Sequence, residues 1–394
     1  TALWRGAART RSIAMWSAVG GAMAALGPLA AGAALVHFWW GSVFLITLPL
    51  AAVAVVAAIV LLPAHVGEER EKVDNLGGVL SVIAVAGVVL GINFAPESGM
   101  GTQTLICSIV GLAAVGAFVL RQRRVEVPLY DLSIARRRTF WVAAVAGILV
   151  FGSLMGAIFI GQQFLQNVLG YSTWTAGLSA LPAAVVMVLV APRSARLVER
   201  YGSRITLVAG YACCAVGFLL MIFIWDSRTS FAMVCFGYAW LGAGVALAGT
   251  PASRALTNAV PVRKAGMASA TADLQRDLGG AVMQSIFGAL LTAGYVGAFD
   301  EQIAANPQAS SVSDQVVGQL TKSFSSAEAV ASRYPQYADQ IVAAARDSFV
   351  SGQKWAFLSG LLAMGLGTAL VWFGFPDRAR ESELIASYHA ADGD

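Results

Sequence analysis

The chain has 394 residues, of which 57% are hydrophobic and only 12% are charged, and its mean hydropathy is +0.69. A soluble domain is about a quarter charged, so this composition excludes a water-soluble protein, which would lack the polar surface to cover its cores. The net charge is only +4, and neither the four cysteines nor the three single histidines have the spacing of a metal centre. We therefore predict an all-α integral membrane protein without metal or cofactor.

Long apolar runs follow one another along the whole chain. A helix needs about 20 apolar residues to cross roughly 30 Å of hydrocarbon. Ten runs meet this requirement, near residues 13–36, 41–62, 76–95, 103–120, 139–165, 174–192, 205–225, 230–250, 267–297 and 353–375. The sequence thus predicts a bundle of about ten transmembrane helices.

The connecting segments alternate in charge. Most of the 26 Lys and Arg residues fall into one set of segments, namely 1–12, 63–75, 121–138, 193–204, 251–266 and 376–394. Positively charged loops stay in the cytoplasm, so we predict that both ends of this chain are cytoplasmic.

The segment 298–352 is the one sizeable extramembrane insertion that we predict, and the alternation puts it on the outer face. Ser325 and Glu328 have the spacing of a capping box at the start of a helix. Four apolar residues of the segment stand at helical spacing: Val316, Val317, Leu320 and Phe324. Two interpretations follow: an amphipathic helix that lies on the membrane or covers a cavity mouth, or a solvated helical loop without a specific role.

The first predicted span is rich in small residues and contains a proline. Gly20, Gly27 and Gly32 would let a neighbouring helix approach closely, and Pro28 would bend the helix. Such a span suits a bundle whose two halves rock against each other. Ordinary packing of Gly and Ala explains the same composition.

Residues 27–32, Gly-Pro-Leu-Ala-Ala-Gly, closely resemble the Gly-Pro-x-x-Gly-Gly antiporter motif of major facilitator drug:proton antiporters, except that Ala31 replaces a glycine. The cytoplasmic loop motif of that family has a similar copy at Glu199, Arg200, Gly202 and Arg204. Further resemblances occur at residues 38–49, 165–182 and 261–280. These matches keep the family order over residues 5–376.

The resemblance is to the fourteen-span subfamily of EmrB-like and QacA-like multidrug exporters. It implies that this chain corresponds to spans five to fourteen and lacks the first four, although a natural ten-span protein is the alternative. The implied divisions are 1–62, the last two spans of an N-terminal bundle; 63–125, a two-span linker hairpin; 126–376, a six-span C-terminal bundle with the insertion; and 377–394, a cytoplasmic tail.

Three ionisable residues fall inside one predicted span: Asp273, Arg276 and Asp277. A charge at mid-bilayer costs about 2.5–3.5 kcal/mol, so the three must pair, face a watery cavity or lie near the interface. One interpretation places them in the cytoplasmic headgroup zone. The other is a network that lines the cytoplasmic half of a cavity, where a carboxylate could take up a proton. The family usually has Asn and Gln at the two Asp positions.

Polar and aromatic residues of the span 139–165 and its end are candidates for substrate contact. They are Phe151, Phe159, Gln162, Gln163 and Gln166. Glutamines facing lipid would be penalised, so we expect them to face the protein interior. Hydrogen bonding between helices explains them as well as ligand binding does.

The function implied by the resemblance is a secondary active transporter of the bacterial plasma (inner) membrane: a proton-coupled exporter of amphipathic or cationic small molecules by alternating access. Its expected partners are the lipid bilayer, a small-molecule substrate, protons and the missing N-terminal spans, with no nucleic acid. An exporter of a lipid or cell-envelope metabolite would share the fold and motifs. An integral membrane enzyme would need a clustered constellation of His, Asp, Glu or Cys, which the sequence does not present.

Overall fold

The computed structural model describes residues 27, 30–61, 74–95, 100–261, 264–305 and 313–392. Within these ranges the chain is helical throughout, without β-strands, and nine helices are long and apolar enough to cross a membrane. They confirm the last nine of the ten predicted spans. The first predicted span lies mostly outside the described residues.

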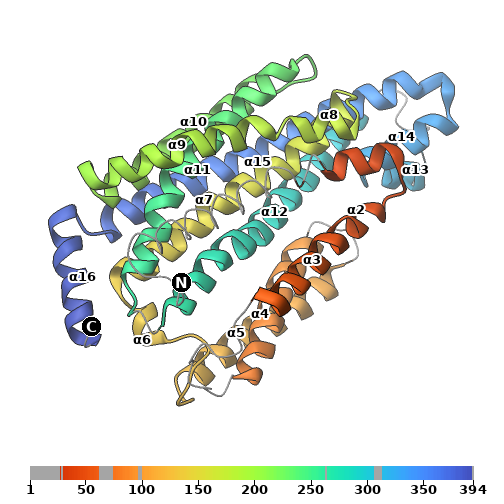
Figure 1. Cartoon of the computed structure of the whole chain (residues 1–394). Helices are drawn as coiled ribbons and strands as arrows, with labels where there is room; N and C mark the ends of the chain where they lie inside the picture. The colour runs from red at the N-terminus through yellow and green to blue at the C-terminus, as the bar shows by residue number, and fades with distance from the viewer. Residues whose placement is uncertain are drawn as a thin grey trace.

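The helices occur in the following order (Figure 1). After the helical residues 30–37, the first part contains α2 (Ser42–Leu45), α3 (Thr47–Leu61), α4 (Asn75–Phe94) and α5 (Gly101–Gln122). The middle part contains α6 (Leu132–Ala135), α7 (Arg138–Gln163) with the π-helical turn η1 (Phe164–Val168), α8 (Thr173–Leu178), α9 (Leu181–Tyr201), α10 (Ser203–Ile224) and α11 (Phe231–Asn258). The last part contains α12 (Ala265–Ala304), α13 (Asp314–Leu320), α14 (Phe324–Arg333), the 3-10 turn η4 (Pro335–Tyr337), α15 (Ala338–Gly374) and α16 (Arg378–Asp392).

Six long helices, α7, α9, α10, α11, α12 and α15, pack into one bundle. Its centre is filled by fully buried large side chains: Phe140, Phe164, Tyr211, Phe218, Trp225, Tyr238, Phe287 and Phe357. The Tyr211 hydroxyl donates to the carbonyl oxygen of Ala146 at 2.7 Å, which joins α10 to α7. The helices carry apolar residues nearly all round because the opposite faces meet lipid or a further part of the protein.

The hairpin of α4 and α5 lies beside α12 (Figure 1). The Asn93 side-chain amide of α4 donates to the Ser285 hydroxyl of α12 at 2.9 Å. At the other end of the hairpin, Arg121 donates to the buried carboxylate of Asp74 at 2.7 Å. The two predicted linker spans are therefore a packed unit on the flank of the bundle.

The two ends of the molecule carry different extramembrane elements. α6 and α16 lie at one end, and α13 and α14 lie at the opposite end (Figure 1). The loop alternation predicts the same arrangement: it puts segments 121–138 and 376–394 on one side of the membrane and the insertion 298–352 on the other. Which end faces the cytoplasm stays a prediction.

The insertion forms two short helices that pack on the bundle. Leu320 ends α13 and Phe324 begins α14, so the apolar residues that we placed at helical spacing belong to two helices. Leu320 and Phe324 are buried, and the Tyr295 hydroxyl of α12 donates to the Leu320 carbonyl oxygen at 3.1 Å. The predicted capping box is wrong, because the N-cap is Ser323, whose hydroxyl accepts from the backbone N–H of Ser326.

The predicted tail is a helix that folds back onto the bundle. The Arg137 guanidinium at the start of α7 donates to both carboxylate oxygens of Asp392 in α16, at 2.6 and 2.9 Å. The Ser203 hydroxyl at the start of α10 donates to Glu381 at 2.7 Å. α16 therefore braces the ends of two bundle helices.

Candidate functional site

α12 lies along α7 in a register fixed by one glutamine. Gln275 is fully buried, and its Nε2 donates to the carbonyl oxygens of Ala143 at 2.6 Å and Ala144 at 3.1 Å. Its Oε1 has no hydrogen-bond partner among the residues described. Gln275 was not among the candidates predicted from the sequence. The sequence signal that could have identified it is its position between Asp273 and Arg276, as an uncharged amide among the charged residues of an apolar span.

The charged cluster of α12 faces away from this buried contact. Arg276 pairs with Asp273 at 3.4 Å, and their side chains are 47% and 50% exposed. Asp277 is exposed as well. The Arg276 guanidinium also lies over the ring of Phe151 in α7, 5.3 Å from its centroid. The structure thus brings together residues that were predicted separately on two helices, Asp273 and Arg276 on α12 and Phe151 on α7.

The depth of the cluster follows from its position along α7. α7 begins at Arg138, whose guanidinium is fixed by the carbonyl oxygens of Phe373 and Gly374. At about 1.5 Å per residue, Phe151 lies about 20 Å further along the helix. Because Arg276 sits over this ring, the cluster lies beside the middle of α7. Whether this level is within the bilayer span or in the headgroup zone stays a prediction. Contact with a substrate stays a prediction.

The aromatic and glutamine candidates of α7 and η1 divide into two groups. The Gln162 amide donates to the Ala176 carbonyl oxygen of α8 at 2.8 Å, and the Gln166 amide donates to the Gln162 carbonyl oxygen at 3.1 Å. Gln162 therefore joins α7 to α8, whereas the bond of Gln166 stays within its own helical segment. Phe159 is 41% exposed and Gln163 is half-buried, so neither side chain is enclosed by the bundle, and their contact with a substrate stays a prediction.

The antiporter motif lies partly in the described chain. Gly20 and Pro28 are outside the described residues, and Gly27 is exposed with open space around it. Gly32 touches the start of α8: a Cβ atom at this position would lie 2.8 Å from the carbonyl oxygen of Thr173. The helix of the motif (Figure 1, red) therefore meets α8 through a contact that only glycine permits without displacement.

The cytoplasmic loop motif forms the turn between α9 and α10. Gly202 has a φ of +87°, a conformation that side-chain-bearing residues rarely adopt. Arg204 stacks on the ring of Trp372, 4.6 Å from its centroid, while the Arg200 carbonyl oxygen accepts from Arg378 of α16 at 3.0 Å. Glu199 is exposed. In this structure the motif holds α9, α10, α15 and α16 together.

Two carboxylates near the α6 end have a lowered pKa. A hydrogen bond from the backbone of Gly77, with those from Arg121 and Gln122, lowers the pKa of Asp74 despite burial. Burial also acts against ionisation of Asp131, but hydrogen bonds from Lys264 and Ser133 lower its pKa to about 2. Both groups are therefore fixed anions with partners and are poor candidates for proton uptake near neutral pH.

In the described ranges, no group of three or more His, Cys, Asp or Glu is placed to hold a metal ion.

Residues 1–284 match the Major Facilitator Superfamily. The multidrug resistance protein Stp of Mycobacterium tuberculosis is 28% identical over 93% of this chain and 69% of its own length. The multidrug efflux pump LfrA of Mycolicibacterium smegmatis is 32% identical over 88% of this chain and 67% of its own length. The methyl viologen resistance protein SmvA of Salmonella typhimurium is 28% identical over 94% of this chain and 74% of its own length.

Proposed function

Because this chain belongs to the Major Facilitator Superfamily, we propose that it works in the proton-coupled export of amphipathic, cationic small molecules by alternating access. The family and its transporter relatives indicate a multi-pass bacterial membrane transporter. The proposal adds the direction of transport, the coupling ion and the class of substrate.

The observation that carries the proposal is the half-exposed cluster of Asp273, Arg276 and Asp277 beside Phe151. A carboxylate inside a membrane span is costly unless it has a function or a partner, and Arg276 can neutralise only one of the two. The remaining negative charge would attract a cation, and an aromatic ring nearby suits an amphipathic cation. A carboxylate can bind either a proton or a cationic substrate but not both at once, so it can couple the movement of one to that of the other.

The names of the relatives agree with this class of substrate. Stp and LfrA are named for multidrug resistance and efflux, and SmvA for resistance to methyl viologen. These names describe the relatives, and their extension to this chain is part of the proposal.

We further propose that the helix of residues 30–37 belongs to one bundle and α8 to the other, and that Gly32 helps to close the seam between them at Thr173. In this proposal the complete transporter has fourteen spans, its first four precede the present chain, and both ends of the chain face the cytoplasm. The chain alone would then not transport, because the first four spans of the N-terminal bundle would be missing.

The test is transport into everted membrane vesicles, with the present chain compared with a version extended by its upstream coding sequence. We expect the extended protein to accumulate the lipophilic cation ethidium when the membrane is energised and to stop when a protonophore is added. Replacement of both carboxylates, Asp273→Asn with Asp277→Asn, should reduce accumulation to that of empty vesicles. Glu383→Gln, which removes an exposed carboxylate of α16, is the control and should transport normally.

Three results would contradict the proposal: transport that persists in the double variant, transport that ignores the protonophore, or activity of the short chain alone. Movement of a fluorescent phospholipid in place of ethidium would support the lipid-exporter alternative.

A further inference from the structure

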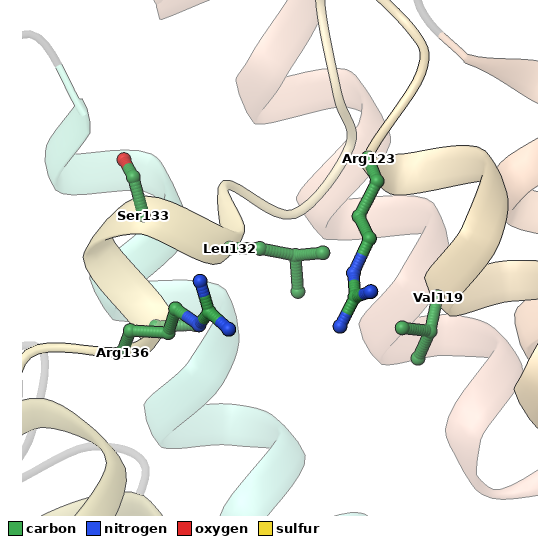
Figure 2. A pocket seen from close by; sticks show the side chains of 6 residues that line it. Val119, Arg123, Leu132, Ser133 and Arg136 are labelled. Carbon is green, nitrogen blue, oxygen red and sulfur yellow. The ribbon is translucent and has the colours of Figure 1, made fainter.

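A pocket of about 400 Å³ lies between the end of α5 and the short helix α6. It is lined by Val119, Arg123, Leu132, Ser133, Ala135 and Arg136. Figure 2 shows Arg123 and Arg136 on either side of Leu132, with both guanidinium groups turned toward the same space. Its volume falls in the range of about 300–1,000 Å³ that is typical of small-molecule sites.

The two arginines of the pocket lack a partner of opposite charge in the part of the chain that the structure describes. Across these residues, neither the Arg123 nor the Arg136 side chain makes a hydrogen bond or an ion pair. Two buried or half-buried carboxylates at this end of the molecule are already engaged, Asp74 by Arg121 and Asp131 by Lys264. Two like charges that share a cavity repel each other, so the pocket is complementary to an anion.

The neighbouring arginines show that partners are available at this end of the molecule. Arg137 holds Asp392, and Arg138 holds the carbonyl oxygens of Phe373 and Gly374. Within the described chain, the two pocket arginines stay unpaired beside them.

The lining of the pocket is charged at the end of α5 and apolar one helical turn earlier. Val119 lies one helical turn before Arg123 in α5, on the side of the apolar span, and Leu132 faces the same space. A phospholipid has the same order of groups, with its phosphate at the surface and its acyl chains below. Guanidinium groups bind phosphate oxygens in a bidentate manner, and basic pockets between transmembrane helices bind anionic head groups.

We propose that this pocket binds the phosphate of an anionic phospholipid, held by Arg123 and Arg136, with an acyl chain along Val119 and Leu132. The lipid would join α5, which belongs to the linker hairpin, to α6, which leads into the six-helix bundle. It would thus fix the hairpin against the bundle at the end where α16 lies.

The test uses the purified full chain in detergent and measures lipid retention by native mass spectrometry together with thermal unfolding. We expect phosphatidylglycerol to be retained and to raise the unfolding temperature more than phosphatidylcholine does. Each arginine near a membrane surface changes anionic lipid affinity about fivefold, so the double variant Arg123→Gln with Arg136→Gln should bind phosphatidylglycerol about thirtyfold more weakly.

Two further variants separate the pocket from general surface charge. Arg124→Gln removes an exposed arginine of the same segment that does not line the pocket, and it should bind phosphatidylglycerol normally. Leu132→Trp keeps every charge but fills the space, and it should lose the bound lipid. Size-exclusion chromatography and unfolding without added lipid show whether each variant is folded.

The proposal fails if Arg124→Gln weakens binding as much as the double variant does, because the effect would then be diffuse charge. It also fails if inorganic phosphate raises the unfolding temperature as much as phosphatidylglycerol does, because the pocket would then be a simple anion site. Equal retention of phosphatidylcholine would overturn it as well.

Discussion

The guanidinium group of Arg276 lies over the ring of Phe151, with 5.3 Å between its central carbon and the ring centroid. This contact joins the charged face of α12 to the middle of α7. Arg276 also pairs with Asp273, 3.4 Å away on its own helix. The charge balance of the cluster therefore depends on a single arginine beside two carboxylates.

Removal of this arginine should change how the extended transporter selects substrates. Arg276→Gln leaves two carboxylates without a compensating cation, so we expect the KM for a monovalent lipophilic cation to fall about threefold to tenfold, an effect limited by solvent exposure. The KM for an uncharged substrate of similar size should stay the same. Equal changes for the two substrates would mean that the charge of Arg276 does not act on the ligand.

Gly32 should tolerate no side chain where it meets α8. In Gly32→Ala the new methyl group would lie 2.8 Å from the Thr173 carbonyl oxygen, so the two segments must separate. Overpacking of this kind costs about 1–3 kcal/mol, and we expect a lower midpoint of thermal unfolding in detergent. Gly27→Ala is the matched control for this stability measurement, because no atom lies within 4 Å of the added methyl group. Equal midpoints for the two variants would show that the contact is not formed.

Gly202 and Gly170 both stand at positions where the backbone favours glycine. Both have positive φ angles, +87° and +70°. A Cβ at Gly170 meets open space, whereas one at Gly202 would lie 2.9 Å from the Cβ of Arg378. We expect Gly170→Ala to destabilise the fold by about 1 kcal/mol and Gly202→Ala by more, measured as thermal unfolding midpoints. Gly202→Ala should also loosen α16, seen as faster amide hydrogen exchange in residues 378–392.

Asp131 should contribute a pH-dependent part of the stability. Its pKa is about 2 in the folded chain, against an ordinary value of 3.8, because burial, which opposes ionisation, is outweighed by hydrogen bonds from Lys264 and Ser133. A lowered folded pKa stabilises the fold above pH 4, and this contribution disappears as the pH falls from about 4 to about 2.

Asp131→Asn tests this dependence, because asparagine still caps α6 while losing the charge. We expect the wild-type protein to unfold at a higher temperature than Asp131→Asn at pH 6, and the difference to shrink as the pH approaches 2. Lys264→Met should behave like Asp131→Asn. A difference that is independent of pH would mean that the carboxylate charge is not responsible.

Hydropathy was enough to predict the last nine spans, because each needs only a long apolar run. Finer features depend on packing between distant segments. The N-cap at Ser323 instead of Ser325 depends on where α14 meets Phe349 of α15, and the rings of Phe324 and Phe349 lie 6.4 Å apart. Residues 378–392 carry no apolar run, so nothing predicted that they would form a helix bound to Arg137 and Ser203.

In the candidate site, too, some features could be predicted from the sequence and others depend on packing between helices. The charges of Asp273, Arg276 and Asp277 were visible in the sequence because ionisable residues are rare in spans. The contact between Arg276 and Phe151 could not be predicted from the sequence, because it depends on the register between α7 and α12. Gln275 stabilises that register, and its position between the charged residues of the span was the one sequence signal that could have identified it.

The cap formed by α13 and α14 is attached to two bundle helices at once, to α12 through Tyr295 and to α15 through Phe349. It must therefore turn with them as one body. In the proposed alternating-access cycle, a spectroscopic label on α14 and another on residues 30–37 would report the swing of one proposed bundle against the other. Neither label would touch the charged face of α12, so motion could be recorded while transport continues.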